Sequence, residues 1–368
     1  MFKKSFLAVC AVIFTVSAAT AVTPAVGGEN LFDLSSPFSL SYGSSVAGGG
    51  VYFVNPTSIT INPALNGRDQ RVGLNAGYTA LVTVGDSQSF GSAVQTGITI
   101  PFKWAVFSGY LNGTFPNTNK MGLSNSASLK AALSKEISER LAIGLGINGG
   151  FEWGPTKDWA LSGNIGMVYT IPNLGFIKDF RYGVSILNLG KNFNPADDSE
   201  FFDGYPGFAT IRTGVAGLLF SNDVIKVGAS FDVSTPCFTN LLMDAGLQLI
   251  IKDSFTISVA DKFNLVETVN GNLNNMRSVE LFLQFKTKVT GNLYIMPSVG
   301  FFFRFKFNVS DNAYLASRDW NESEMTVGGA WKNMYSDVHA VSGELNLSLG
   351  LKDETPPVIM IWFDEDEE

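Results

Sequence analysis

The sequence of 368 residues contains one histidine and only 16% charged residues. With His339 as the only histidine, neither a Ser-His-Asp triad nor a metal site with two histidine ligands can form within the chain. The formal net charge is −8, and nothing in the sequence resembles the basic surface of a nucleic-acid-binding protein. We therefore expect a protein that is not an enzyme, has no cofactor and no metal, and binds no nucleic acid.

The chain also lacks long apolar runs, although its mean hydropathy is positive, +0.16. After the N-terminal segment, no run approaches the roughly 18 residues of a membrane-spanning helix. Glycine, with 38 residues, and phenylalanine, with 30, are nevertheless abundant. A chain of this kind must either bury its apolar side chains in a very large core or expose them to lipid on a β-barrel.

Residues 1–21 have the features of a cleavable signal peptide. Lys3 and Lys4 form a positive start, a short apolar stretch follows, and Ala19-Thr20-Ala21 provides a small-residue cleavage site. We predict cleavage after Ala21, with cleavage after Ala19 as the near alternative. The sequence therefore predicts an exported protein.

Alternation with a period of two residues is the strongest pattern in the chain. Apolar residues alternate with small or polar residues in segments 141–148, 279–286, 301–309 and 341–352. Successive side chains of a strand point to opposite faces, so each segment has one apolar face. The pattern predicts β-strands throughout.

Two features favour a membrane barrel over a soluble β-sandwich, which would show the same alternation. The predicted strands run about 10 to 14 residues, which suits a tilted membrane crossing better than a soluble sheet. Aromatic residues also lie near predicted strand ends, as interfacial girdles require. These residues are Trp104, Tyr110, Trp153, Trp159, Tyr169 and Tyr182. We predict an all-β fold, a transmembrane antiparallel β-barrel surrounded by outer-membrane lipid in the cell outer membrane.

Fourteen strands are predicted, at residues 71–84, 92–101, 103–113, 125–137, 140–153, 159–171, 180–190, 208–220, 223–233, 240–251, 254–263, 276–287, 293–309 and 338–352. Bacterial barrels have short periplasmic turns and long external loops, and both chain ends normally lie in the periplasm. Starting the first strand at the periplasm places every predicted tight turn there and every long link outside. Residues 325–331 are an additional strand candidate. A fifteenth strand would end the barrel outside, so we assign them to the final external loop, residues 310–337.

Residues 22–70 do not alternate cleanly and contain two Asn-Pro steps, Asn55-Pro56 and Asn62-Pro63. Proline fixes φ and restricts the preceding residue, so both steps favour turns. A barrel of fourteen strands is wide enough to hold this segment as a plug. We predict an N-terminal hatch at 22–70 inside the lumen of a barrel at 71–352, with a plain entry turn into the first strand as the alternative.

With this plug, the chain resembles the FadL-type family of outer-membrane transporters for long-chain fatty acids and other hydrophobic molecules. The stretch from Tyr42 to Gly50, followed by Asn62-Pro63-Ala64, looks like the family's N-terminal hatch with its Asn-Pro-Ala turn. In style the chain is most similar to the FadL-like proteins of spirochaetes (the UPF0164 grouping). It departs from the family pattern in the additional Asn55-Pro56 step, and in continuing past the last strand instead of ending in an aromatic residue.

The resemblance implies passive uptake of hydrophobic small molecules, such as fatty acids, that leave sideways into the bilayer when the hatch rearranges. Asn62, Pro63 and Ala64 would form the hatch turn along the substrate passage, and Asn55 and Pro56 a second bend. A general porin would instead have an open lumen with rings of charge. A surface adhesin or a secretion-accessory barrel would act through its loops or its tail. Both remain alternatives.

Residues 353–368 form an acidic C-terminal tail. Pro356-Pro357 and a short apolar run precede five consecutive acids. Such a segment could pair as a strand with a periplasmic partner, although a flexible polar end is the more common behaviour and is the one we favour.

The motif Gly144-x-Gly146-x-x-Gly149 matches the dinucleotide-binding pattern by its letters. It lies inside an alternating strand that no helix follows, whereas a phosphate-binding loop opens a helix. We therefore interpret these glycines as small residues that face the barrel lumen.

Overall fold

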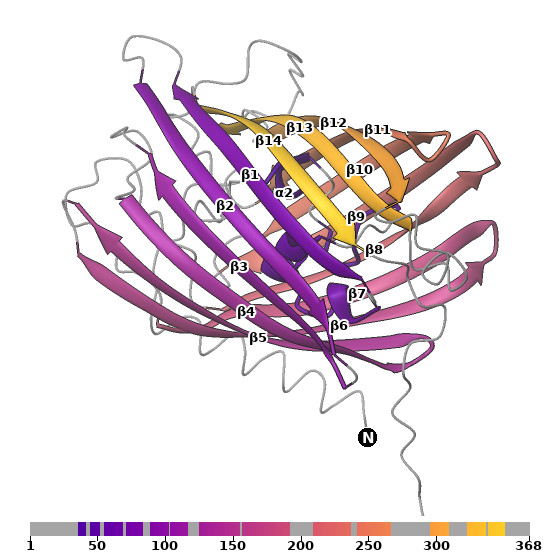
Figure 1. Cartoon of the computed structure of the whole chain (residues 1–368), viewed down its shortest axis with the longest axis horizontal. Helices are drawn as coiled ribbons and strands as arrows, with labels where there is room; N and C mark the ends of the chain where they lie inside the picture. The colour runs from indigo at the N-terminus through magenta and orange to yellow at the C-terminus, as the bar shows by residue number, and fades with distance from the viewer. Residues whose placement is uncertain are drawn as a thin grey trace, which may run out of the picture.

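The computed structural model describes residues 36–41, 45–51, 55–68, 71–83, 89–102, 104–116, 125–154, 157–191, 209–236, 241–265, 295–308, 322–335 and 338–349. Their strands form one closed antiparallel barrel (Figure 1). In chain order the strands are β1 (Val72–Thr83), β2 (Ser89–Pro101), β3 (Val106–Phe115), β4 (Asn125–Ser138), β5 (Leu141–Trp153), β6 (Asp158–Leu174), β7 (Ile177–Lys191), β8 (Thr210–Ser221), β9 (Ile225–Pro236), β10 (Leu242–Ile251), β11 (Phe255–Asn264), β12 (Ile295–Asn308), β13 (Glu322–Tyr335) and β14 (Val338–Leu349).

Every strand pairs with its neighbours in the sequence, and β14 closes the barrel against β1. That last pairing runs from Val72 opposite Leu349 to Thr83 opposite Val338. Closure leaves no strand edge unpaired, which is what a sheet in hydrocarbon requires because no water is present to bind the backbone. The prediction of a closed barrel of fourteen antiparallel strands is confirmed.

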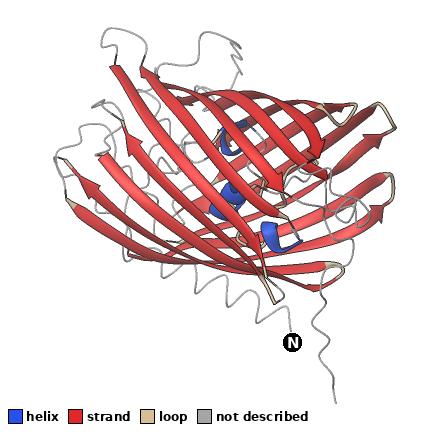
Figure 2. Ribbon diagram, viewed as in Figure 1, coloured by secondary structure: helices blue, strands red, loops and turns tan. Residues whose placement is uncertain are grey.

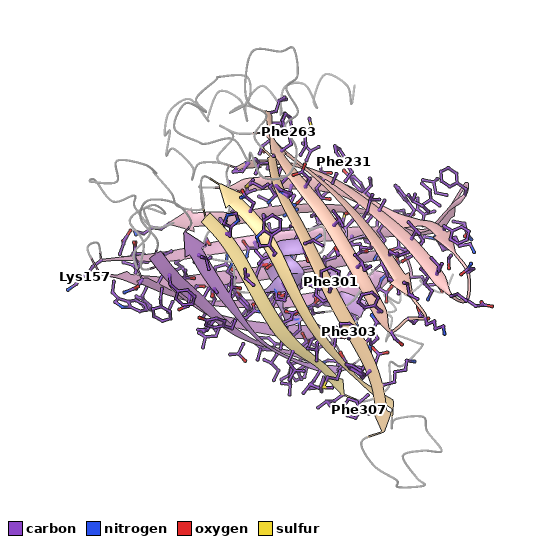
Figure 3. All side chains as sticks on the ribbon, turned by 90° about the horizontal axis from the view of Figure 1, so that it is seen from above. Lys157, Phe231, Phe263, Phe301, Phe303 and Phe307 are labelled. Atoms are coloured by element: carbon purple, nitrogen blue, oxygen red, sulfur yellow. The ribbon has the colours of Figure 1, made fainter. Side chains whose placement is uncertain are left out.

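The alternation in the sequence separates an outer from an inner face. On β5, Leu145 and Ile147 point outward and are 61% and 63% exposed. Ala142, on the opposite face of the same strand, is buried. On β14, Val341 is exposed and Glu344 is buried. Figure 3 shows Phe301, Phe303 and Phe307 of β12 along the same outward face. The outside of the barrel is therefore apolar and the inside is small or polar, as predicted.

Aromatic side chains gather toward both ends of the outer face. Trp153 and Trp159 are exposed near one end, and Trp104, stacked on Phe102 with ring centroids 6.2 Å apart, is exposed near the other. Tyr110, which we predicted to belong to such a girdle, is buried and points into the lumen instead. The reason is its register, because Ser108, Tyr110 and Asn112 all share the buried face of β3.

The fourteen strands are not quite the fourteen that were predicted. Residues 322–335, assigned above to a loop, form β13, which pairs with β12 and β14. Residues 325–331 are the strand candidate set aside above on parity, because a fifteenth strand would have ended the barrel outside. Gly328 is required there because a Cβ atom would overlap the ring of Phe302. The predicted strand 276–287 lies outside the described residues, and β11 pairs directly with β12.

Because of β13, the predicted rule that every long link lies outside is wrong near the C-terminus. The turns at 139–140, 175–176, 222–224 and 252–254 all lie at one end, called here the short-turn end. Phe255 pairs with Phe303, and Asn308 pairs with Glu322, so residues 309–321 connect β12 and β13 at that same end. Only two residues separate β13 from β14 at the opposite end.

Inside the barrel lie three short helical elements, α2 (Pro37–Ser41), η2 (Pro56–Thr60) and η3 (Leu65–Arg68) (Figure 2). We refer to residues 36–41, 45–51 and 55–68 together as the inner segment. Nearly all of it is buried. Within the described part of the chain, no helix is long and apolar enough to cross a membrane.

The predicted signal peptide, residues 1–21, and the predicted acidic tail, residues 353–368, lie outside the described residues.

Candidate functional site

The candidate site is the contact between the inner segment and the lumenal wall. It is built on glycines that face inward from the strands. At each of them, a Cβ atom would overlap an atom of the inner segment, a backbone atom at Gly144, Gly183 and Gly228 and a side-chain atom at the other three, so glycine permits this close approach. These positions are Gly97, Gly144, Gly166, Gly183, Gly228 and Gly300. They are distributed around the wall, so the inner segment fits against most of its circumference.

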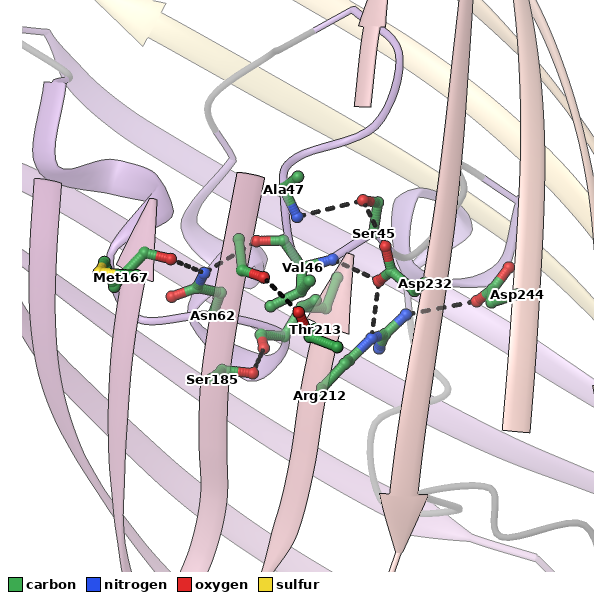
Figure 4. A network of polar contacts seen from close by, with 12 residues as sticks. Ser45, Val46, Ala47, Asn62, Met167, Ser185, Arg212, Thr213, Asp232 and Asp244 are labelled. Atoms are coloured by element: carbon green, nitrogen blue, oxygen red, sulfur yellow. Dashed lines mark hydrogen bonds and ion pairs between the residues drawn. The ribbon is translucent and has the colours of Figure 1, made fainter. Parts of the chain in front are cut away.

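Asn62 is the most connected residue of the predicted hatch turn. Its Oδ1 accepts a hydrogen bond from the backbone N–H of Ala64 (2.9 Å), which forms the turn around Pro63. Its Nδ2 donates to the carbonyl oxygen of Val46 (2.8 Å) and to that of Met167 on β6 (3.1 Å) (Figure 4). One buried amide therefore joins two parts of the inner segment to each other and to the wall.

Asn55 has a corresponding role at the start of η2. Its Oδ1 accepts from the N–H and the hydroxyl of Thr57, both at 3.0 Å, and Pro56 occupies the first helical position. Its Nδ2 donates to Glu344 on β14 (3.3 Å). Ser36 donates to the same carboxylate (2.8 Å). Glu344 thus fastens residues that lie on either side of α2.

The buried Asp232 of β9 is the anchor of residues 45–47. It accepts hydrogen bonds from Ser45 Oγ (2.8 Å) and from the backbone N–H of Val46 (2.6 Å). Arg212 of β8 pairs with it through Nε at 2.9 Å and reaches Asp244 of β10 at 3.3 Å (Figure 4). Asp232 therefore contacts the inner segment directly and belongs to an ion-pair network that spans three neighbouring strands.

The backbone of residues 49–51 is bound by side chains of the wall. Arg181 of β7 donates through Nη2 to the carbonyl oxygens of Gly49 (2.7 Å) and Gly50 (3.0 Å). Gln248 of β10 accepts from the backbone N–H of Val51 (2.6 Å). A buried loop must have its polar backbone groups bonded, and here the wall bonds them.

The structure places all five predicted site residues in the inner segment but does not bring them into one cluster. Asn55 and Pro56 lie toward β14, whereas Asn62 lies against β6. Pro63 and Ala64 form the turn that follows Asn62. Their part in substrate passage stays a prediction.

The wall residues that hold the inner segment were not predicted as site residues. Alternation places Asp232 and Glu344 on the inner face, yet it gives no sign of which inward residues meet the plug. Those contacts join residues as many as 308 positions apart in the chain, as Ser36 and Glu344 are. A single sequence carries no pattern for pairs of that kind.

These features define an outer-membrane β-barrel with an apolar outer face and an occupied lumen. Its fold is similar to that of the CymD monoaromatic hydrocarbon channel, with a TM-score of 0.50 and 8% identity over 87% of this chain and 100% of that chain. The Pseudomonas putida toluene transporter TodX (TM-score 0.47, 11% identity, 87% of this chain and 98% of that chain) and a Pseudomonas aeruginosa FadL homologue (0.43, 11%, 86% and 98%) are also similar. No protein-family model and no curated protein matches the sequence.

Proposed function

We propose that this protein is a passive outer-membrane transporter of hydrophobic small molecules such as long-chain fatty acids, of the FadL type. In this proposal residues 22–70 are the hatch, 71–352 the barrel and 353–368 a tail, with 1–21 removed as a signal peptide. The spirochaete FadL-like grouping is part of the same proposal.

The observation that carries the proposal is the position of the inner segment inside the lumen. The inner segment contacts inward residues of strands as far apart around the barrel as β3, β7, β9 and β14. A general porin needs an open aqueous lumen, whereas a transporter of apolar molecules needs a barrier to ions that a solute can pass. The fold shared with a monoaromatic hydrocarbon channel gives further support.

The buried charges of the wall also support a plug over an open pore. Asp232 and Glu344 both accept hydrogen bonds from the inner segment and so do not line free space. Charges used in this way hold a plug in position. They do not form the solvated rings expected of a porin.

Uptake of a radiolabelled long-chain fatty acid by proteoliposomes tests the proposal. We expect faster uptake than in empty liposomes, with low ion conductance in planar bilayers. Asn62→Ala removes three hydrogen bonds of the inner segment, so it should raise ion conductance. Asn222→Ala is the matched control, because Asn222 bonds only turn residues Val224 and Ile225 among the contacts described for it. No gain in uptake, together with large conductance of the unaltered protein, would favour a porin.

A further inference from the structure

A cavity of about 210 Å³ lies between the inner segment and the wall formed by β5, β6 and β7. Its apolar side consists of Ala64 and Leu65 from the inner segment and of Ala142 and Val168 from the wall. All four side chains are at least nine-tenths buried. The volume is larger than that of an apolar cavity of ~150 Å³ that binds benzene, so one aromatic ring fits with room for a small substituent.

The other side of the cavity is polar. Thr170 is buried, and no hydrogen-bond partner for its hydroxyl is found among the described residues. Arg181 is 3% exposed and also lines the cavity. A buried hydroxyl without a partner destabilises the protein, and a ligand that accepts its hydrogen bond would recover that loss.

An irregularity in β7 directly precedes Arg181 and affects the direction of its side chain. The pairing of β7 with β8 shifts register between Lys178 and Arg181, and Asp179 between them has a positive φ of 49°. Bulges of this kind redirect side chains next to functional sites. Arg181 Nη2 is used by Gly49 and Gly50, and its Nε lies 3.6 Å from Asp179 Oδ2.

The charges around the cavity favour an anionic over a cationic ligand. Arg68 also lines it, and its Nε is paired with Glu136 at 2.9 Å. Asp179 is the only acid among the lining residues, and its side chain is 45% exposed, so it can turn into solvent at little cost. Because Nη2 is bonded to Gly49 and Gly50, the Nε of Arg181, which faces Asp179, is the atom at which a ligand carboxylate would bind.

We propose that this cavity binds a small organic carboxylate whose apolar body is about the size of one aromatic ring. The carboxylate replaces Asp179 beside Arg181 and accepts a hydrogen bond from Thr170. The ring packs against Leu65 and Val168. The site lies toward the short-turn end and is too small for a long alkyl chain. Binding to this cavity is measured without transport, so its outcome is independent of whether the protein transports fatty acids.

Calorimetric titration of the full-length protein in an uncharged detergent tests the site, with benzoate as the probe. We expect saturable binding of benzoate and about tenfold weaker binding of benzamide, which has the same shape without the charge. Hexadecanoate should not displace benzoate. Equal binding of benzoate and benzamide, or no binding of benzoate, would overturn the proposal.

Variants identify the residues. Asp179→Asn removes the competing carboxylate and should tighten benzoate binding, whereas Thr170→Val, close in shape, should weaken it severalfold. Arg181→Lys should weaken it about tenfold, since a lysine has no N–H at the position of the Arg181 Nε beside Asp179. Arg71→Lys is the matched control, because Arg71 pairs with Glu324, away from the cavity, at 3.1 Å. Heat-modifiable gel mobility verifies folding. Unchanged benzoate affinity in both Asp179→Asn and Thr170→Val would place the ligand elsewhere.

Discussion

Asp232 is a single side chain on which the position of residues 45–51 depends. It accepts hydrogen bonds from Ser45, Val46 and Arg212, and it is almost fully buried. Replacing one member of a buried ion pair costs about 3–5 kcal/mol, because the other charge is left without compensation. Asp232 joins the inner segment to Arg212 of the wall, so its replacement is expected to weaken the attachment of the inner segment.

Asp232→Asn is therefore expected to loosen residues 45–51 while the barrel stays folded. The readout is a cysteine placed at Val46, which is fully buried, in a chain in which Cys237 is replaced by serine. Its reaction with a water-soluble thiol reagent should become at least about tenfold faster than in the parent. A tenfold change corresponds to about 1.4 kcal/mol in the free energy of the opening that exposes the cysteine. Asp244→Asn, which leaves the contacts with Ser45 and Val46 in place, should change the rate less. Equal rates in Asp232→Asn and the parent would show that the carboxylate does not hold this stretch.

At the scale of elements, the inward glycines set how closely strands and the inner segment approach. A Cβ atom at Gly144 of β5 would overlap the backbone of Pro63 and Ala64. Gly149 of the same strand, interpreted above as lumenal, instead faces outward beside Leu129 and Leu161, and a Cβ atom there would meet nothing within 4 Å. The two positions thus separate the effect of the plug from the general effect of glycine in a strand. This comparison needs no change in charge.

Gly144→Ala is expected to displace the inner segment and to destabilise the protein by roughly 1–3 kcal/mol, as overpacking does. Gly149→Ala should be neutral or stabilise by about 0.5–1 kcal/mol, because glycine weakens a strand. The measurement is the midpoint of heat-modifiable mobility in detergent, together with ion conductance. A lowered midpoint in both variants would mean that strand conformation, and not contact with Pro63 and Ala64, decides the outcome.

Most of the strands could be predicted from the sequence because each carries its own alternation, which is a local property. β13 was a candidate at 325–331 but was excluded on parity, because parity cannot decide which of two candidates, 276–287 or 325–331, belongs to the barrel. The strand count was nevertheless right, because parity forced fourteen while one strand was omitted and another, at 276–287, was included. Tyr110 shows the same limit, as a girdle residue and a lumenal residue look alike until the register is known.

The site was predictable only on the side of the inner segment. Asn55 and Asn62 stand out because an Asn-Pro step restricts the backbone locally. Glu344 and Arg181 do not stand out, because their partners lie far away in the sequence. The fit of a plug in a barrel is a property of the closed molecule and depends on which strands face each other across the lumen.

At the scale of the whole molecule, the outer face determines where the barrel resides. Ile147 lies midway along β5 and is 63% exposed, whereas Leu174 ends β6 beside the turn at 175–176 and is 45% exposed. On a soluble protein, both side chains would be ordinary surface residues. In a bilayer they differ, because the cost of a charge depends on its depth.

We expect Ile147→Arg to destabilise the barrel in phospholipid vesicles by about 2–4 kcal/mol and Leu174→Arg by about 0–1 kcal/mol. Reversible unfolding in guanidinium, followed by tryptophan fluorescence, measures both changes. The control is the same pair in detergent, where a flexible micelle adapts to the charge and the difference should shrink. A difference that is equally large in detergent would come from packing within the sheet, and similar small costs at both positions in vesicles would mean that β5 does not cross the centre of the bilayer.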